Sequence, residues 1–302
     1  MIKLFEKVIK EHLAEHISEK DFPLSYLKFS TVTSGSGLND KVIFMVFRNG
    51  TSSPSLCLKT VRNYGAREAI LRNFNNLKTL NTLTLGSHYV RLFAQALYLY
   101  DDGENIFSVE TVCLGKRIRL NKERLKIVVT DYSDFQKYLA QQDKNSMRDI
   151  KQLAEETAIK SGLNESDRHQ LLKYIVRKLP TSITLPRIIQ HGDCTSDNLL
   201  WSKNGLCIVD YDYVGNSDIP GFDLFGLLHR FDRVGLSSLC KEYFPAYFKK
   251  IGGKSLDGNY RGLFLLYHIT EYVQSKPHNS KDISFTQIVS DFEHLYPATL
   301  FL

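Results

Sequence analysis

Two aspartates and an asparagine stand at spacings that suit phosphate chemistry. Asp193 and Asn198 are separated by four residues in HGDCTSDN, and Asp210 ends the apolar run LCIVD. Phosphoryl transfer needs a carboxylate to receive a hydroxyl proton, and hard oxygen ligands for a magnesium ion that bridges phosphates. One tight loop can supply the base and one ligand, and the end of the next strand the other. We therefore predict Asp193 as the catalytic base and Asn198 and Asp210 as metal ligands.

The wider segment carries a family resemblance. HGDCTSDNLLW followed by CIVDYDYVGNSDIPGFDL resembles the aminoglycoside phosphotransferase and choline kinase-like family, with its H-G-D-x-x-x-x-N, I-D-[WFY]-[ED]-Y and F-D-[LI] motifs. The matching positions are His191, Gly192, Asp193, Asn198, Asp210, Asp212, Tyr213, Phe222 and Asp223, and Val209 replaces the isoleucine. The resemblance implies a protein kinase-like fold, ATP and Mg²⁺ as cofactors, and structural roles for His191 and Asp223. Asp197 and Asp212 could each contact a cationic substrate or face water.

A kinase also needs a loop over the phosphates, a lysine and a glutamate that pairs with it. In TSGSGLND, between two predicted strands, Gly35 and Gly37 let backbone N–H groups approach phosphates. Lys59 is a lone cation in the apolar run LCLKT, a costly placement unless it is paired or binds a ligand. Glu68 is the acidic residue of the following helix, GAREAILRNF, so we predict that it pairs with Lys59.

The run IFSVETVCLG ends the β-rich part of the sequence and is where the resemblance implies a hinge. The Glu110 carbonyl and the Val112 N–H would then hydrogen-bond adenine, and Val109 would line the pocket behind it. Backbone contacts leave little trace in side-chain identity, so this assignment depends on the resemblance.

Patterning divides the chain into two lobes. An opening amphipathic helix precedes strand-like runs and one helix, up to about residue 112. Beyond this, five segments have helical spacing and only RIIQ and LCIVDY are strand-like. We expect a bilobal α+β fold: a nucleotide-binding lobe at residues 1–112 with an antiparallel sheet and one main helix, and a mainly helical lobe at 113–302 that holds the catalytic loop and the acceptor site.

The acceptor is less clearly marked. A polycationic aminoglycoside would call for clustered carboxylates, which the C-terminal helices lack. Choline would need an aromatic cage with an acid, for which the candidates are Tyr243, Tyr247, Tyr260, Tyr267, Glu271 and Tyr272. Aromatic residues at helical spacing are more often core. A sugar or a glycan intermediate is equally compatible.

Three functions follow. The first is an ATP- and Mg²⁺-dependent kinase of a small hydroxylated molecule. The second is a nucleotide-binding regulatory or scaffold protein without turnover, and the third is a kinase of a protein or a large glycan. The full set of Lys59, Asp193, Asn198 and Asp210 favours catalysis.

Bulk composition indicates an ordinary globular chain. No apolar run is long enough for a membrane span or a signal peptide, so we expect a cytoplasmic protein. The five cysteines are scattered without a C-x-x-C pair, which predicts reduced, mostly buried thiols. The net charge of +6 is modest, and its densest stretch, residues 115–127, is best interpreted as a solvated face. No nucleic-acid-binding motif is recognisable.

Overall fold

The computed structural model describes residues 1–13, 27–33, 41–48, 51–142, 147–178, 184–233, 235–252, 261–275 and 284–296. Its contacts divide the chain into two compact units. The first unit combines Met1–Ile118 with Asp197–Val214, and the second combines Arg119–Ser196 with Gly215–Leu302. The predicted boundary at residue 112 differs from this division in one respect, because it placed residues 197–214 in the helical lobe. The reason is strand pairing: this segment forms a hairpin that joins a strand of the first unit.

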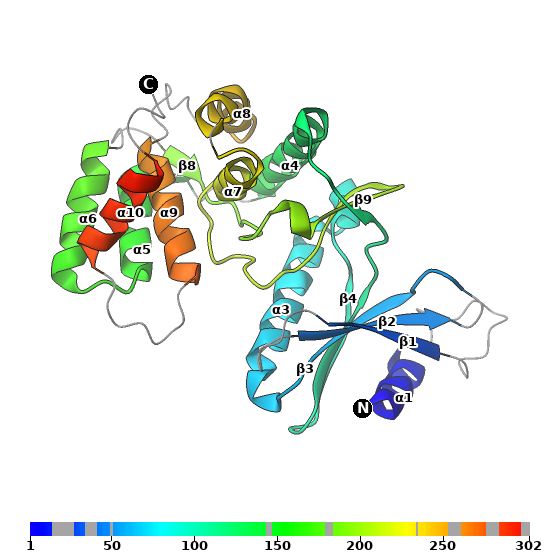
Figure 1. The fold of residues 1–302 in the computed structure, drawn as a ribbon. Coiled ribbons are helices and arrows are strands. Elements are labelled where there is room, and N and C mark those ends of the chain that lie inside the picture. Colours follow the sequence, from blue (N-terminus) through cyan, green and yellow to red (C-terminus); the bar gives the residue numbers. More distant parts are fainter. Residues whose placement is uncertain are drawn as a thin grey trace. The chain divides into compact units, whose positions relative to one another are not determined.

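A five-stranded antiparallel sheet forms the centre of the first unit (Figure 1). Its order is β1-β2-β3-β5-β4, with bounds β1 Leu27–Thr33, β2 Lys41–Arg48, β3 Leu56–Val61, β4 Ala96–Asp101 and β5 Ile106–Thr111. In the register of this sheet, Ile43 and Ser108 each lie opposite Lys59, and Glu110 lies opposite Cys57. Since side chains alternate between faces along a strand, these five residues project from one face of the sheet.

A helix packs on each face of the sheet. Helix α1 (Ile2–His12) buries Phe5, Val8 and Ile9 against one face, where they meet Leu58 and Val109. Helix α3 (Arg67–Thr84), preceded by the 3₁₀ turn η1 (Tyr64–Ala66), packs on the other face through Ile70, which meets Val61 and Ile106. Lys59 and Glu110 belong to this second face.

The rest of the first unit is a small sheet of order β10-β9-β6. Its strands are β6 Lys116–Arg117, β9 Leu199–Ser202 and β10 Gly205–Ile208, the 3₁₀ turn η3 (Ser196–Asn198) leads into β9, and η2 (His88–Leu92) precedes β4. Cys207 Sγ lies 3.7 Å from the Arg91 carbonyl oxygen, so β10 also contacts η2. These contacts explain why residues 197–214 belong to the first unit.

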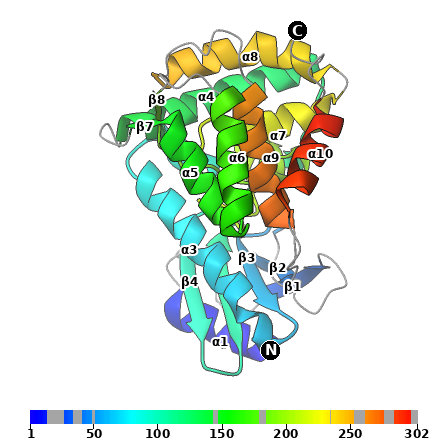
Figure 2. The same cartoon turned by 90° about the vertical axis from the view of Figure 1, so that its left-hand side faces the viewer.

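The second unit is mainly helical (Figure 2). Its helices are α4 Lys122–Gln142, α5 Ile150–Lys160, α6 Glu165–Lys178, α7 Phe222–Phe231, α8 Leu236–Lys250, α9 Arg261–Ser275 and α10 Phe285–Leu295, with a two-stranded sheet of β7 Met147–Asp149 and β8 Thr184–Pro186. Helix α6 packs against α5, α9 and α10. The aromatic core of the unit lies between α7, α8 and α9, where Phe225, Phe244 and Phe264 are in contact.

The predicted α+β class is confirmed, with an antiparallel N-terminal sheet and a mostly helical remainder. The strand predicted at RIIQ is wrong: residues 187–190 have no strand geometry, although Ile188 and Gln190 donate backbone hydrogen bonds to Asp218 and Ser217. All five cysteines are free, and four of them are buried. Among the helices in the described ranges, none combines the length and apolar character that crossing a membrane requires.

Candidate active site

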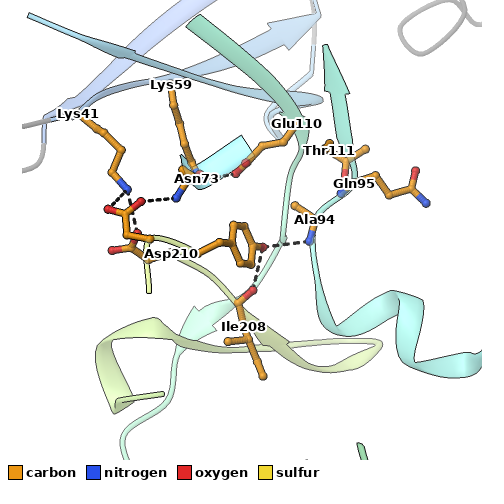
Figure 3. A network of polar contacts seen from close by, with 12 residues as sticks. Lys41, Lys59, Asn73, Ala94, Gln95, Glu110, Thr111, Ile208 and Asp210 are labelled. Atoms are coloured by element: carbon orange, nitrogen blue, oxygen red, sulfur yellow. Dashed lines mark hydrogen bonds and ion pairs between the residues drawn. The ribbon is translucent and has the colours of Figure 1, made fainter. Parts of the chain in front are cut away.

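Lys59 lies at the centre of a buried polar network in the first unit (Figure 3). Only 5% of this residue is exposed. Its Nζ lies 2.8 Å from Glu110 Oε1, donates a hydrogen bond of 3.1 Å to Asn73 Oδ1 and lies over the ring of Tyr211. Burial opposes the charge, but Glu110 together with Cys57 and Asp210 outweighs burial and raises the pKa of Lys59. The lysine is therefore a fixed cation on this face of the sheet.

The predicted pairing of Lys59 with Glu68 is wrong. Glu68 is exposed in the first turn of α3, whereas the helix presents Asn73 to the lysine. The helical period is the reason: Ile70, which packs against the sheet, and Glu68 are two residues apart and so lie on opposite sides of the helix. The negative charge beside Lys59 comes instead from Glu110 on β5.

Asn73 is a functional candidate that the sequence interpretation missed. It is fully buried, and its amide bridges two groups: Oδ1 accepts from Lys59, and Nδ2 donates to Asp212 Oδ1 at 2.7 Å. Its position follows Ile70 by three residues and precedes Leu77 by four, so it lies on the apolar stripe of α3. In the sequence, the signal for Asn73 was a polar residue at a helical position where the pattern calls for an apolar one.

Asn73→Ala is expected to destabilise the protein by about 1–3 kcal/mol, because it leaves a buried donor and a buried acceptor without their amide partner. Urea unfolding of the full chain measures this free energy. Asn75→Ala on the exposed side of the same helix is the matched control and is expected to change little. Equal stability of the two variants would show that the bridge contributes nothing.

The two acidic residues after β10 are both bound to a lysine. Lys41 Nζ donates to Asp210 Oδ1 at 2.9 Å and to Asp212 Oδ2 at 2.7 Å. Asp212 thus has one oxygen on Lys41 and the other on Asn73. Asp212 therefore has a place in this network, which neither of the two roles considered for it included.

The backbone at Asp210 has an uncommon conformation, with φ at 67°. A non-glycine residue at positive φ is held there by its surroundings. The next residue supplies the anchor: Tyr211 is fully buried, its hydroxyl donates to the Ile208 carbonyl and accepts from the Ala94 N–H, and its own carbonyl accepts from Asn76. Tyr211 therefore fixes the turn from which the Asp210 carboxylate extends (Figure 3).

The donor set around Asp210 fits a hard cation. Asp210 offers carboxylate oxygens and Asn198 an amide oxygen, and the Val209 N–H donates to the Asn198 carbonyl at 2.9 Å, which ties the two segments together. The Lys41 ammonium already occupies a cation position against Asp210. In the described part of the chain, no group of three or more His, Cys, Asp or Glu side chains is arranged so that it could hold a metal ion by itself. Magnesium needs only one or two protein carboxylates when nucleotide phosphates complete its coordination.

The predicted nucleotide-binding residues meet different outcomes. Glu110 and Val112 lie at the end of β5, but the Glu110 side chain is committed to Lys59. Val109 does not line a pocket on this face, because it packs against α1 on the opposite face of the sheet. Gly35 and Gly37 lie outside the described residues.

In the second unit, Asp223 holds the backbone of the His191–Gly192 loop. Its Oδ2 accepts from the His191 N–H at 2.6 Å and its Oδ1 from the Gly192 N–H at 2.8 Å. The Tyr132 hydroxyl donates a third hydrogen bond to Oδ2. Burial raises the pKa of Asp223, while His191 and these donors oppose the rise. This geometry agrees with the structural role that the resemblance implies.

Asp193 follows this loop, and its side chain is partly exposed. A turn continues from it, with the Thr195 N–H donating to the Asp193 carbonyl at 2.9 Å. Arg230, in the last turn of α7, brings Nη2 to 3.5 Å from Asp193 Oδ1. Burial raises the pKa of Glu271 on α9, although the Arg230 charge acts against this. Arg230 and Glu271, a cation and an acidic residue, thus both lie close enough to Asp193 to interact electrostatically with it.

The aromatic cage considered for choline does not form as a set. Tyr247 and Tyr267 are fully buried, and their hydroxyls contact Gln136 and the Pro220 carbonyl. These two are core residues, and Tyr260 lies outside the described residues. Asp197 is highly exposed, and the Arg117 guanidinium lies 3.8 Å away.

Comparison with solved structures identifies the fold class as that of protein kinase-like phosphotransferases. A thermostable mutant of aminoglycoside phosphotransferase APH(4)-Ia, in a ternary complex with ADP and hygromycin B, has a TM-score of 0.56 at 11% identity, covering 88% of this chain and 92% of that chain. A mutant of aminoglycoside 2'-phosphotransferase-IIIa in its GDP complex has a TM-score of 0.51 at 14% identity, covering 97% and 96%. A choline/ethanolamine kinase family protein from Mesorhizobium loti has a TM-score of 0.44 at 15% identity, covering 95% of each chain.

A sequence comparison adds a family match over part of the chain. Residues 114–259 match the model of the phosphotransferase enzyme family. This segment contains the His191–Gly192–Asp193 loop and both aspartates that follow β10. The predicted resemblance to aminoglycoside phosphotransferases and choline kinase-like proteins is thereby confirmed. Among curated proteins, none matches this chain.

Proposed function

We propose that this chain is an ATP- and Mg²⁺-dependent kinase that transfers the γ-phosphoryl group to a hydroxyl of a small molecule. The observation that carries the proposal is the network of the first unit, in which Lys59 from β3 is linked through Asn73 to the acidic turn after β10. A buried cation and exposed carboxylate oxygens are the elements that hold a metal–nucleotide pair. The family match over residues 114–259 supports the same chemistry.

Each residue has a role in this proposal. Lys59 binds the α- and β-phosphates, and the Glu110 carbonyl and Val112 N–H bind the base. Asn198 and Asp210 hold the magnesium ion, which neutralises charge on the phosphates. Asp193 orients the acceptor hydroxyl and receives its proton.

The acceptor side supports a small hydroxylated molecule without a high positive charge. Arg230 beside Asp193 disfavours a polycation at the point of transfer, because like charges repel there. Sugars, glycan intermediates and amino alcohols all remain in this class. A protein or large-glycan acceptor is tested alongside them.

A second function is nucleotide binding without turnover. It is favoured by one departure from the expected kinase pattern: the α3 side chain that meets Lys59 is an amide, and the charge partner is on β5. A regulatory or scaffold protein would tolerate that change.

Two measurements separate the two functions. One is the release of ADP or GDP from Mg²⁺–ATP or Mg²⁺–GTP across a panel of sugars, choline, ethanolamine, aminoglycosides, a protein and a polysaccharide. The other is the melting temperature with and without nucleotide. Acceptor-dependent release that stops when the metal is chelated supports the kinase. A rise in melting temperature with nucleotide but no release with any acceptor, a protein and a polysaccharide included, supports binding alone. No thermal shift and no release would contradict both.

A further inference from the structure

Lys41 was not among the residues that the motifs pointed to, yet it contacts both carboxylates of the acidic turn. Its Nζ lies 2.9 Å from Asp210 Oδ1 and 2.7 Å from Asp212 Oδ2. The Lys41 side chain is only 12% exposed. The pair is therefore a built contact rather than a loose surface ion pair.

The two carboxylates differ in how firmly they are held. Asp212 has its second oxygen on the Asn73 amide, and its side chain is 22% exposed. The Asp210 side chain is 45% exposed. Asp212 thus acts as the fixed end of the contact with Lys41, and Asp210 as the end that a solution ligand can reach.

Lys41 and Lys59 project from the same face of the sheet. Ile43 lies directly opposite Lys59, and Lys41 precedes Ile43 by two residues, so the alternation of the strand places both lysines on one face. Diagonal neighbours of this kind are about 7–8 Å apart at their backbones, within reach of long side chains. Figure 3 shows both side chains extending from the sheet toward the acidic turn.

The two lysines differ in their partners. Lys59 is neutralised by Glu110, which lies on the sheet itself. Lys41 is shared between Asp212 and Asp210, and the proposed function assigns Asp210 to the metal. A divalent cation and the Lys41 ammonium would therefore compete for the same carboxylate oxygen.

We propose that Lys41 moves between two anions: it binds Asp210 in the free protein and binds the nucleotide phosphates when a metal ion takes Asp210. The inference rests on the proposed function and adds a residue to it. Metal alone would leave Lys41 with Asp212 as its one remaining partner of the two carboxylates, whereas a metal–nucleotide pair brings phosphate groups that replace Asp210 as the second anion. Lys41 thus makes metal binding depend on the nucleotide.

Lys41→Met tests this by two affinities that move in opposite directions. Mn²⁺ alone, measured by the loss of its free electron paramagnetic resonance signal, is expected to bind the full-length variant at least about fivefold tighter than the wild type, and Mg²⁺–ADP, measured by calorimetry, at least about fivefold weaker. Lys59→Met is expected to weaken Mg²⁺–ADP without tightening Mn²⁺, since its charge partner is Glu110. Lys78→Met, on the exposed face of α3, is the surface control.

A purely structural role for Lys41 would lower both affinities together or change neither, and either result overturns the inference. Lys41→Gln carries the same test if the methionine variant does not fold. Absence of Mg²⁺–ADP binding by the wild type would overturn the proposed function and this inference with it. If the wild type bound Mg²⁺–ADP and Lys41→Met had unchanged affinities for both Mn²⁺ and Mg²⁺–ADP, only this inference would be overturned.

Discussion

Asp193→Asn is expected to lower acceptor-dependent turnover by about 10²–10⁴-fold, because an amide keeps the shape of the side chain but cannot receive the acceptor proton. The loop itself should stay intact, since Asp223 holds the N–H groups of His191 and Gly192 and not the Asp193 carboxylate. Release of ADP with the best acceptor of the panel measures the change. Affinity for Mg²⁺–ADP should remain close to that of the wild type.

Asp197→Asn is the matched control for this experiment. It removes the same charge four residues further along the chain, from a side chain that is 76% exposed. Its turnover is expected to stay within about twofold of the wild type, as for a surface change away from a site. If the two variants retained similar turnover, Asp193 would not be the base.

Asp223→Ala is expected to cost about 3–5 kcal/mol of stability, because it removes one acceptor from three buried donors. Two of them are the backbone N–H groups of His191 and Gly192, and the third is the Tyr132 hydroxyl. The residue is 2% exposed, so water cannot replace the carboxylate without a rearrangement of the loop. Urea unfolding of the full chain, followed by circular dichroism, measures the loss.

Tyr132→Phe removes one donor from the same group and keeps the carboxylate. Its expected cost is smaller, about 1–2 kcal/mol, as for a single buried hydrogen bond. If Asp223→Ala lost less stability than Tyr132→Phe, the carboxylate would not be what holds the loop.

The fold was predictable where the pattern was strong. Alternation and turn residues predicted the strands of the five-stranded sheet, and the run LCLKT became β3 with Lys59 inside it. Helices α8 and α10 were not predicted. In α8, charged residues and the internal Pro245 interrupt the helical pattern. The strand predicted at RIIQ shows the opposite error: Ile188 is buried, but the segment forms only isolated backbone hydrogen bonds, such as those to Asp218 and Ser217.

The site was predictable only in part, because some contacts depend on strand register. Nothing near Lys59 in the sequence indicates Glu110, since β3 and β5 are neighbours in the sheet but separated in the chain by α3 and β4. Asn73 was predictable from its place on an apolar stripe, and Glu68 should have been rejected by the same periodicity. Lys41 has no signal of its own, because its role follows from facing the turn after β10.

The composition of the two units has a consequence for how the chain can be recombined. The first unit takes residues from both sides of the Arg119–Ser196 segment, and the boundary falls between Ser196 and Asp197, inside the H-G-D-x-x-x-x-N motif. A single crossover near residue 112 would therefore separate the sheet from its own β9–β10 hairpin and from Asp210. A chimera that exchanges the helical unit between relatives needs three junctions, near residues 118, 196 and 214. The helical unit is thus carried by two separate segments of the chain, Arg119–Ser196 and Gly215–Leu302, rather than by one continuous domain.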